Sequence, residues 1–182
     1  MNKTEANLQE EIQRHKNIPL ILDSYKDIFS DFDPRPFSER ALSDDFLIEC
    51  KRAAREKDEF ELELILSVPH DKRNMSNELK IKKRLKDHFR KHFQEKEKEV
   101  SEIKKDGITW VTLGVGILLG VVYGLAHVTS NFLEALITIF EIPSWFLVWE
   151  GMDKILIDAR KLEPDQLFYK KMANVKINFL GY

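Results

Sequence analysis

Two acidic residues and a threonine lie on one face of an apolar segment in the C-terminal third of the sequence. Glu134 and Glu141 are seven residues apart with Thr138 between them, a spacing that brings all three to one side of a helix. An ionised carboxylate in mid-bilayer costs about 3 kcal/mol, so Glu141 must be protonated, paired, or directed at a wet cavity or an oligomer interior. Such a group could serve a proton or ion path; alternatively, it is a neutral acid hydrogen-bonded to a neighbouring helix.

The other reactive or metal-ligating residues form no recognisable catalytic or metal-binding pattern. His88 and His92 have the spacing of two ligands on one helical face, but DHFRKH lacks the glutamate of HExxH and the sequence places no third ligand. We expect a solvated pair and no metal. Cys50 lies among apolar neighbours, as a core thiol does. Phosphate-binding loops, dinucleotide fingerprints and GxSxG are absent, so we expect neither an enzyme nor a cofactor.

Three glycines form a GxxxGxxxG pattern at Gly116, Gly120 and Gly124. Small residues at every fourth position form a groove on one helix face, where another backbone can approach closely. The groove could seat the second apolar helix of the same chain or drive self-association; the sequence leaves both interpretations open.

Two apolar stretches can position these residues across a membrane. The chain of 182 residues is 33% charged, yet Ile108–Val128 contains no Asp, Glu, Lys or Arg. As a helix it extends for about 31 Å, the thickness of the hydrocarbon core of a bilayer. A second stretch covers Phe132–Trp149 after a connection around Ser130 that can join only antiparallel neighbours. We predict a two-helix transmembrane hairpin over 107–150; a buried core hairpin in a soluble protein is the alternative.

Charge and tryptophan placement predict the orientation of the hairpin. Basic residues precede and follow the pair and are absent from the connection, which places both termini in the cytoplasm. Trp110, Trp145 and Trp149 fall at the ends that this topology assigns to the cytoplasmic interface.

The charged remainder predicts a small cytosolic α+β domain. Ser43, Asp44 and Asp45 begin a helix that ends near Lys57, and FELELILSV over Phe60–Val68 alternates as a half-buried strand does. Val175–Phe179 predicts a closing strand that pairs with it. We therefore divide the chain into a loosely held N-terminal arm (1–37), a cytosolic domain (38–106), the hairpin (107–150) and a cytosolic C-terminal segment whose last strand packs on that domain (151–182).

An amphipathic helix leads into the first apolar stretch. Ile81, Leu85, Phe89 and Phe93 recur at every fourth position and form its apolar stripe. Its basic face is expected to meet anionic lipid headgroups rather than nucleic acid, because the acidic EKEKE follows directly. The basic residues of this face are Lys82, Lys83, Lys86, Arg90 and Lys91.

Most of the chain beyond Asp33 resembles an uncharacterised family of small bacterial two-span membrane proteins. Its matching positions are Trp145, Trp149, Asp158, Arg160 and the strand Val175–Phe179; PFSERALSDDFLIE, ELELILSVP and a basic helix ending in HF are also similar. The resemblance implies a multi-pass protein of the bacterial cytoplasmic membrane with the topology given above, and it implies no activity.

Together these features predict a non-enzymatic membrane-anchored module that forms a homo-oligomer and whose cytosolic domain binds a protein or a small ligand. The alternative is a regulated pore or membrane-perturbing effector with Glu141 lining the path.

Overall fold

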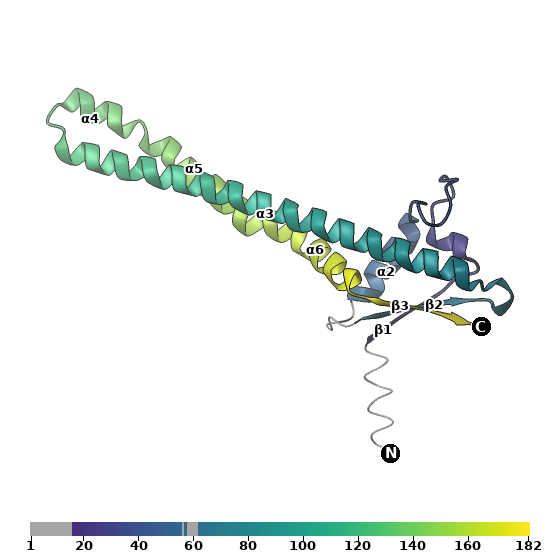
Figure 1. Ribbon diagram of the computed structural model, residues 1–182. Helices are drawn as coiled ribbons and strands as arrows, with labels where there is room; N and C mark the ends of the chain where they lie inside the picture. Colours follow the sequence, from purple (N-terminus) through teal and green to yellow (C-terminus); the bar gives the residue numbers. More distant parts are fainter. Residues whose placement is uncertain (1–15, 56, 58–61) are drawn as a thin grey trace, which may run out of the picture. The chain divides into compact units, whose positions relative to one another are not determined.

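The computed structural model describes residues 16–55, 57 and 62–182, and these form two compact units. One unit combines the described residues up to Gln94 with Leu167–Tyr182, and the other comprises Glu95–Gln166. The first is a mixed α/β unit and the second is entirely helical (Figure 1). The mixture of helix and strand agrees with the predicted α+β class, but the unit boundaries differ from the predicted ones at 37, 106 and 150.

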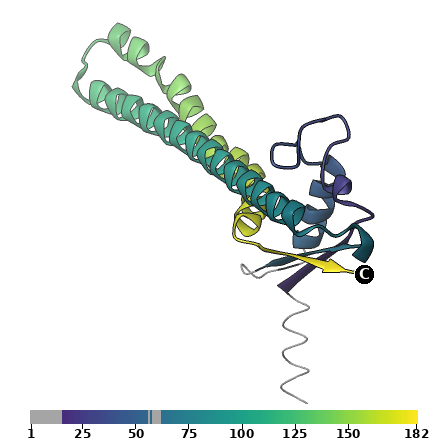
Figure 2. The ribbon, with the colours of Figure 1, turned by 45° about the vertical axis from the view of Figure 1, so that its right-hand side comes forward.

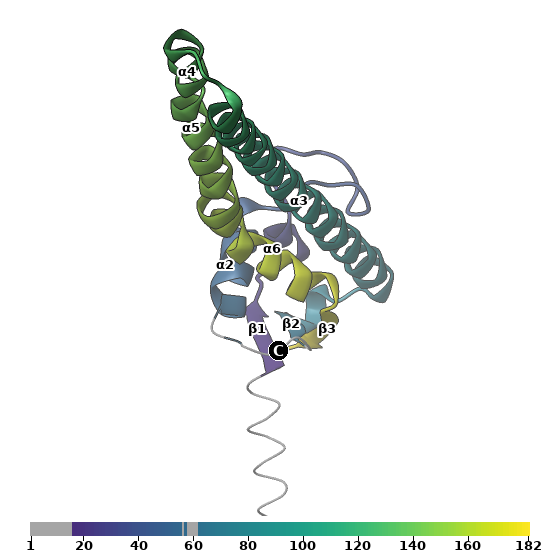
Figure 3. The same ribbon diagram turned by 90° about the vertical axis from the view of Figure 1, so that its left-hand side faces the viewer.

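Three parallel strands form the sheet of the α/β unit in the order β1-β2-β3 (Figure 3). They are β1 (Asn17–Ile21), β2 (Glu63–Val68) and β3 (Lys176–Gly181), with Leu66 of the central strand opposite Leu20 and Phe179. The predicted pairing of the FELELILSV strand with the C-terminal strand is confirmed. Its first two predicted residues, 60 and 61, lie outside the described residues.

One face of the sheet carries the core. Alternate residues of β2 are buried there, and they join apolar side chains of three helices in one cluster. The helices are α2 (Asp44–Arg55), the beginning of α3 (Met75–His127) and the end of α6 (Ala159–Ala173). Cys50 of α2 is fully buried, as expected for a core thiol, and burial raises the pKa of this thiol to about 12.

The prediction of a loosely held N-terminal arm is wrong for residues 16–37, the described part of that segment. Strand β1 and the 3₁₀-helix η1 (Tyr25–Ile28) belong to the unit, and Ile18 and Ile28 are fully buried. Pro19 lies within β1, which is an edge strand, where the missing N–H of a proline is tolerated. Residues 1–15 of the predicted arm lie outside the described residues.

Helix α3 is continuous over its whole length, and it carries both the amphipathic stripe and the first apolar stretch. Ile81, Leu85 and Phe89 are fully buried in the core of the α/β unit, as their spacing predicts. The helix begins after a short 3₁₀-helix η2 (His70–Lys72) and ends before the connection 128–130.

The second apolar stretch is not one helix. It divides into α4 (Asn131–Thr138) and α5 (Glu141–Asp153), followed by a π-helical segment η3 (Lys154–Asp158) and α6. Pro143 has no N–H, and its ring would collide with the carbonyl group of Ile139. The backbone tightens there, and the N–H of Phe140 bonds to the carbonyl of Ile137 at 3.1 Å.

Substitution of Phe179 tests the closing strand. Phe179 is 6% exposed and Leu180, on the opposite face of β3, is 51% exposed. We expect Phe179→Ala to lower the free energy of unfolding of the α/β unit by about 3–5 kcal/mol and Leu180→Ala to change it by less than about 0.5 kcal/mol. Cys50 is the only cysteine, so thiol labelling along a urea gradient measures opening of this unit in the full-length protein. Equal urea midpoints for the two variants would contradict the assigned register.

Candidate functional site

Small residues bring the two apolar segments of the helical unit into close contact. A Cβ atom added at Gly151 would lie 2.5 Å from the carbonyl oxygen of Gly107, and one added at Gly114 would lie 2.8 Å from that of Ser144. Ser144 is fully buried. Gly107, Gly114, Ser144 and Gly151, which we call the small-residue seam, therefore let the two backbones touch, as small residues do between helices in membranes. In Figures 1 and 2 the α4–α5 segment lies beside the second half of α3.

This seam was not predicted from the sequence. Gly107 and Gly114 are seven residues apart, as are Ser144 and Gly151, and this heptad spacing on two antiparallel helices is the signal that could have revealed it. The GxxxGxxxG pattern, with its shorter spacing, predicts a contact on a different face of α3.

Two of the three predicted glycines take no part in the seam. A Cβ atom at Gly116 or Gly120 would have no heavy atom within 4 Å, whereas one at Gly124 would lie 3.1 Å from the side chain of Ile137. Gly124 thus contacts the second apolar segment of its own chain, while Gly116 and Gly120 present an open surface. We call these two residues the open glycine face.

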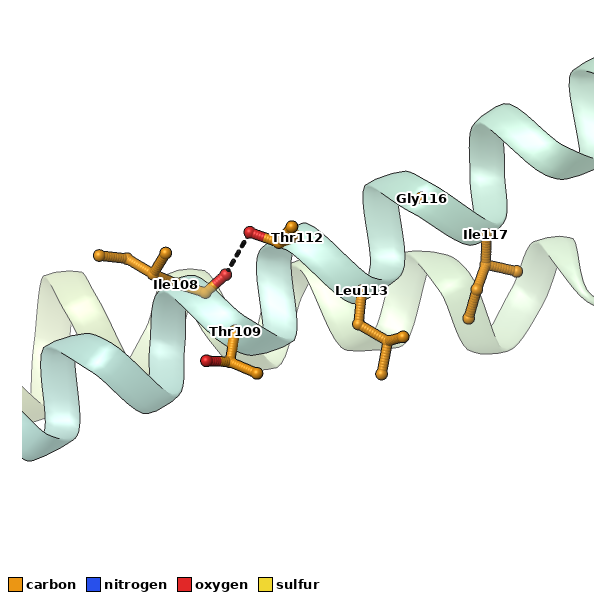
Figure 4. Close-up of a pocket in the computed structure, with 6 residues that line it drawn as sticks. All are labelled: Ile108, Thr109, Thr112, Leu113, Gly116 and Ile117. Carbon is orange, nitrogen blue, oxygen red and sulfur yellow. Dashed lines mark hydrogen bonds between the residues drawn. The ribbon is translucent and has the colours of Figure 1, made fainter.

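An open, shallow hollow of about 570 Å³ extends over Gly116. Figure 4 shows the residues that line it, all from α3: Ile108, Thr109, Thr112, Leu113, Gly116 and Ile117. The hydroxyl of Thr112 donates to the carbonyl of Ile108 at 2.7 Å, and that of Thr109 to the carbonyl of Lys105 at 2.9 Å. Because both hydroxyls are satisfied within the helix, the hollow offers a mainly apolar surface.

All three tryptophans occur toward one end of the apolar helix pair. Val111 contacts Gly151 and Gly114 contacts Val148, so Trp110 and Trp149 lie at about the same level. Trp145 lies one turn farther along. Their side chains are 39%, 64% and 50% exposed, respectively, so they are available to a surrounding interface.

The predicted polar residues of the second apolar stretch lie on the outside of the helix pair. Glu134 and Thr138 line one hollow of about 470 Å³, and the Thr138 hydroxyl donates to the carbonyl of Glu134 at 2.9 Å. Glu141, the first residue of α5, does not line this hollow and is exposed. The contacts of Ser144 with Gly114 and of Ile137 with Gly124 put Glu141 near the middle of the apolar pair.

Basic residues next to the apolar segments have acidic partners. Lys98 lies 3.7 Å from Glu102, Lys154 lies 3.9 Å from Glu150, and Lys161 lies 2.9 Å from Asp158. The hydrogen bond from Lys161 lowers the pKa of the Asp158 carboxyl below its usual value. A fourth pair joins Lys104 of α3 to Glu163 of α6 at 3.9 Å. These basic residues beside the apolar segments are therefore paired with acidic residues and do not form a purely cationic surface.

The predicted headgroup-binding lysines and arginine belong to the part of α3 in the α/β unit. Lys83, Lys86, Arg90 and Lys91 are exposed, but Lys82 is half-buried with its Nζ 5.8 Å from the centre of the Phe179 ring. The charge of Lys82 thus covers an aromatic residue of β3. Sixteen residues of helix separate Lys91 from the start of the charge-free stretch at Ile108.

His88 is not the solvated residue that its spacing suggested. Its Nε2 atom is buried and has no hydrogen-bond partner among the described residues, and burial lowers its pKa to about 4. The His88 and His92 rings lie 4.2 Å apart, and His92 stacks on Tyr169 with ring centres separated by 5.3 Å. No group of three metal-ligating side chains occurs in the described part of the chain.

A buried polar network connects η1 to the first turn of α3. The Tyr25 hydroxyl donates to Glu78 Oε1 at 2.9 Å and accepts from the Asn74 N–H at 2.8 Å, while Arg73 donates to both oxygens of Glu78. The hydrogen bonds from Arg73 lower the pKa of the Glu78 carboxyl. With its charge neutralised in this way, Glu78 can remain 3% exposed.

No family model matches this chain, and neither a curated protein nor a solved structure matches it.

Matched glycine substitutions test the small-residue seam. Gly151→Ala places a methyl group against the backbone of α3, whereas Gly116→Ala places it in open space. We expect the first substitution to destabilise the helix pair by about 1–3 kcal/mol and the second to be tolerated. All three tryptophans lie in the helical unit, so tryptophan fluorescence during denaturation in detergent reports on this unit. Similar losses of stability in both variants would contradict the seam.

Proposed function

We propose that this protein is a non-enzymatic module that anchors in a bilayer through two spans, associates with copies of itself and displays its α/β unit on one side of the membrane. The proposal depends chiefly on the exposure of the two apolar helices. Each is long and apolar enough to cross a membrane, and only 11% and 6% of the residues in their most apolar 18-residue stretches are buried. The core helix of a soluble protein would be mostly buried.

Strand pairing supports an arrangement with both ends of the apolar pair on the same side. The chain leaves the α/β unit after Gln94 and returns to it at Leu167. Because β2 and β3 are neighbours in one sheet, the segments before and after the apolar helices cannot be separated by a bilayer. The pairing supports an even number of spans, and the basic residues on both flanks favour the cytoplasmic side.

Two features of the helical unit support self-association. The open glycine face includes Gly116, which lines the hollow described above, and it is not used by the chain's own second apolar segment. Glu141 is exposed near the middle of the pair, where contact with lipid would be unfavourable for its ionised form. Contact with a second copy would fill the glycine face, and an oligomer interior would shield the carboxyl group.

Substitution of the open glycine face tests this proposal. We expect Gly116→Ile combined with Gly120→Ile to weaken association by about tenfold or more, because the added side chains hold the neighbouring backbone away. Val122→Ile is the matched control: Val122 is 65% exposed and lies on another face of α3. Energy transfer between labelled copies in nanodisc or vesicle membranes measures the effect, and tryptophan fluorescence verifies that the helix pair remains folded.

Two results would contradict the proposal. One is a wild-type protein that stays monomeric across the concentration range. The other is an oligomer that the glycine double variant and the Val122→Ile control affect equally.

A further inference from the structure

A third hollow, in the α/β unit, has the composition of a binding site for a small anion. Its volume is about 400 Å³, within the usual range for small-molecule sites. Four lining residues come from the loop between η1 and α2, and two come from the start of α3. They are Arg35, Pro36, Phe37, Ser38, Asn77 and Lys80.

The lining combines two cations with two neutral hydrogen-bond donors and contains no acidic residue. Lys80 supplies one positive charge, Arg35 supplies a second that is paired with Asp33, and the Ser38 hydroxyl and the Asn77 amide can donate. Lys80 has no hydrogen-bond or ion-pair partner among the described residues. Glu78, the acid of the neighbouring turn, is buried and bound by Arg73 and Tyr25, so it does not offset this charge. The positive end of the α3 dipole adds to it.

Arg35 is held in place before any ligand arrives. Asp33 accepts from Arg35 Nε at 2.9 Å and from Nη2 at 2.8 Å, and it also accepts from the N–H of Ala41 at 2.7 Å. These hydrogen bonds lower the pKa of the Asp33 carboxyl well below its usual range, so it stays ionised near neutral pH. They occupy one side of the guanidinium group and leave Nη1 available, since a guanidinium has five N–H donors.

The loop that carries Arg35 is also fixed to α3. Arg84 of the helix donates to the carbonyl of Arg40 at 3.0 Å, and Arg40 donates to the carbonyl of Ser30 at 3.0 Å. Phe37 stacks on Phe29 with ring centres 5.2 Å apart. The loop residues and the α3 residues of the hollow therefore keep their separation, as a pre-organised site requires.

We propose that this hollow binds a small molecule through a phosphate group, with the organic part of that molecule against Phe37 and Pro36. The free Nη1 of Arg35, a lysine and neutral donors can together contact the oxygens of a phosphate. The inference goes beyond the proposed function by giving a chemical class of ligand for the α/β unit.

Calorimetric titration of the full-length protein in nanodiscs of neutral lipid tests the site. The probes are AMP, inorganic pyrophosphate and adenosine, which lacks the phosphate. We expect AMP and pyrophosphate to bind and adenosine not to bind. Lys80→Gln should weaken AMP binding by about tenfold, because one charged hydrogen bond is lost. Lys86→Gln, an exposed lysine on another face of the same helix, should leave AMP binding within about twofold of wild type.

Cys50 labelling confirms that each variant is folded. Failure of both anions to bind, equal binding of adenosine and AMP, or equal weakening by the two lysine substitutions would overturn the proposal. The oligomeric state is measured on the same nanodisc preparation. Anion binding that fails in an intact oligomer refutes the site alone, and a monomer that still binds AMP refutes self-association alone.

Discussion

The pairing of β2 with β3 is the contact on which the remaining structure depends. It joins a strand that precedes both apolar helices to one that follows them, so the chain must return to the unit from which it left. The entropic cost of closing so long a loop grows only slowly with its length, and burial of Ile177 and Phe179 in the core offsets it. The same pairing requires that any insertion into a bilayer use an even number of spans.

Within the helical unit, two sets of glycines have different environments although they lie on the same helix. Gly107 and Gly114 of the small-residue seam meet the backbone of α5, whereas Gly116 and Gly120 of the open glycine face meet nothing. Packing within the chain and packing between chains can therefore use separate faces. Under the proposed function, this separation would let the helix pair associate with a second copy without rearrangement.

Much of the fold follows from local patterns, whereas the contacts between distant segments do not. Three signals lie within single elements: the alternation before Val68, the four-residue spacing of Ile81, Leu85 and Phe89, and the charge-free stretch. The structure contains the corresponding strand and helix. Strand β1 was missed because it is short and contains Pro19. The seam depends on the register between two helices, and the Arg35 hollow depends on a loop meeting α3, so neither has a local signature.

The most direct test of the central claim is the accessibility of single cysteines in intact cells. In a Cys50→Ala background, Ser130→Cys places a thiol in the connection 128–130, and Ser76→Cys places one on the exposed first turn of α3 in the α/β unit. A membrane-impermeant maleimide should label the Ser130→Cys variant from outside and label the Ser76→Cys variant only after the membrane is permeabilised. Equal labelling of both variants before permeabilisation would contradict the proposed two-span arrangement.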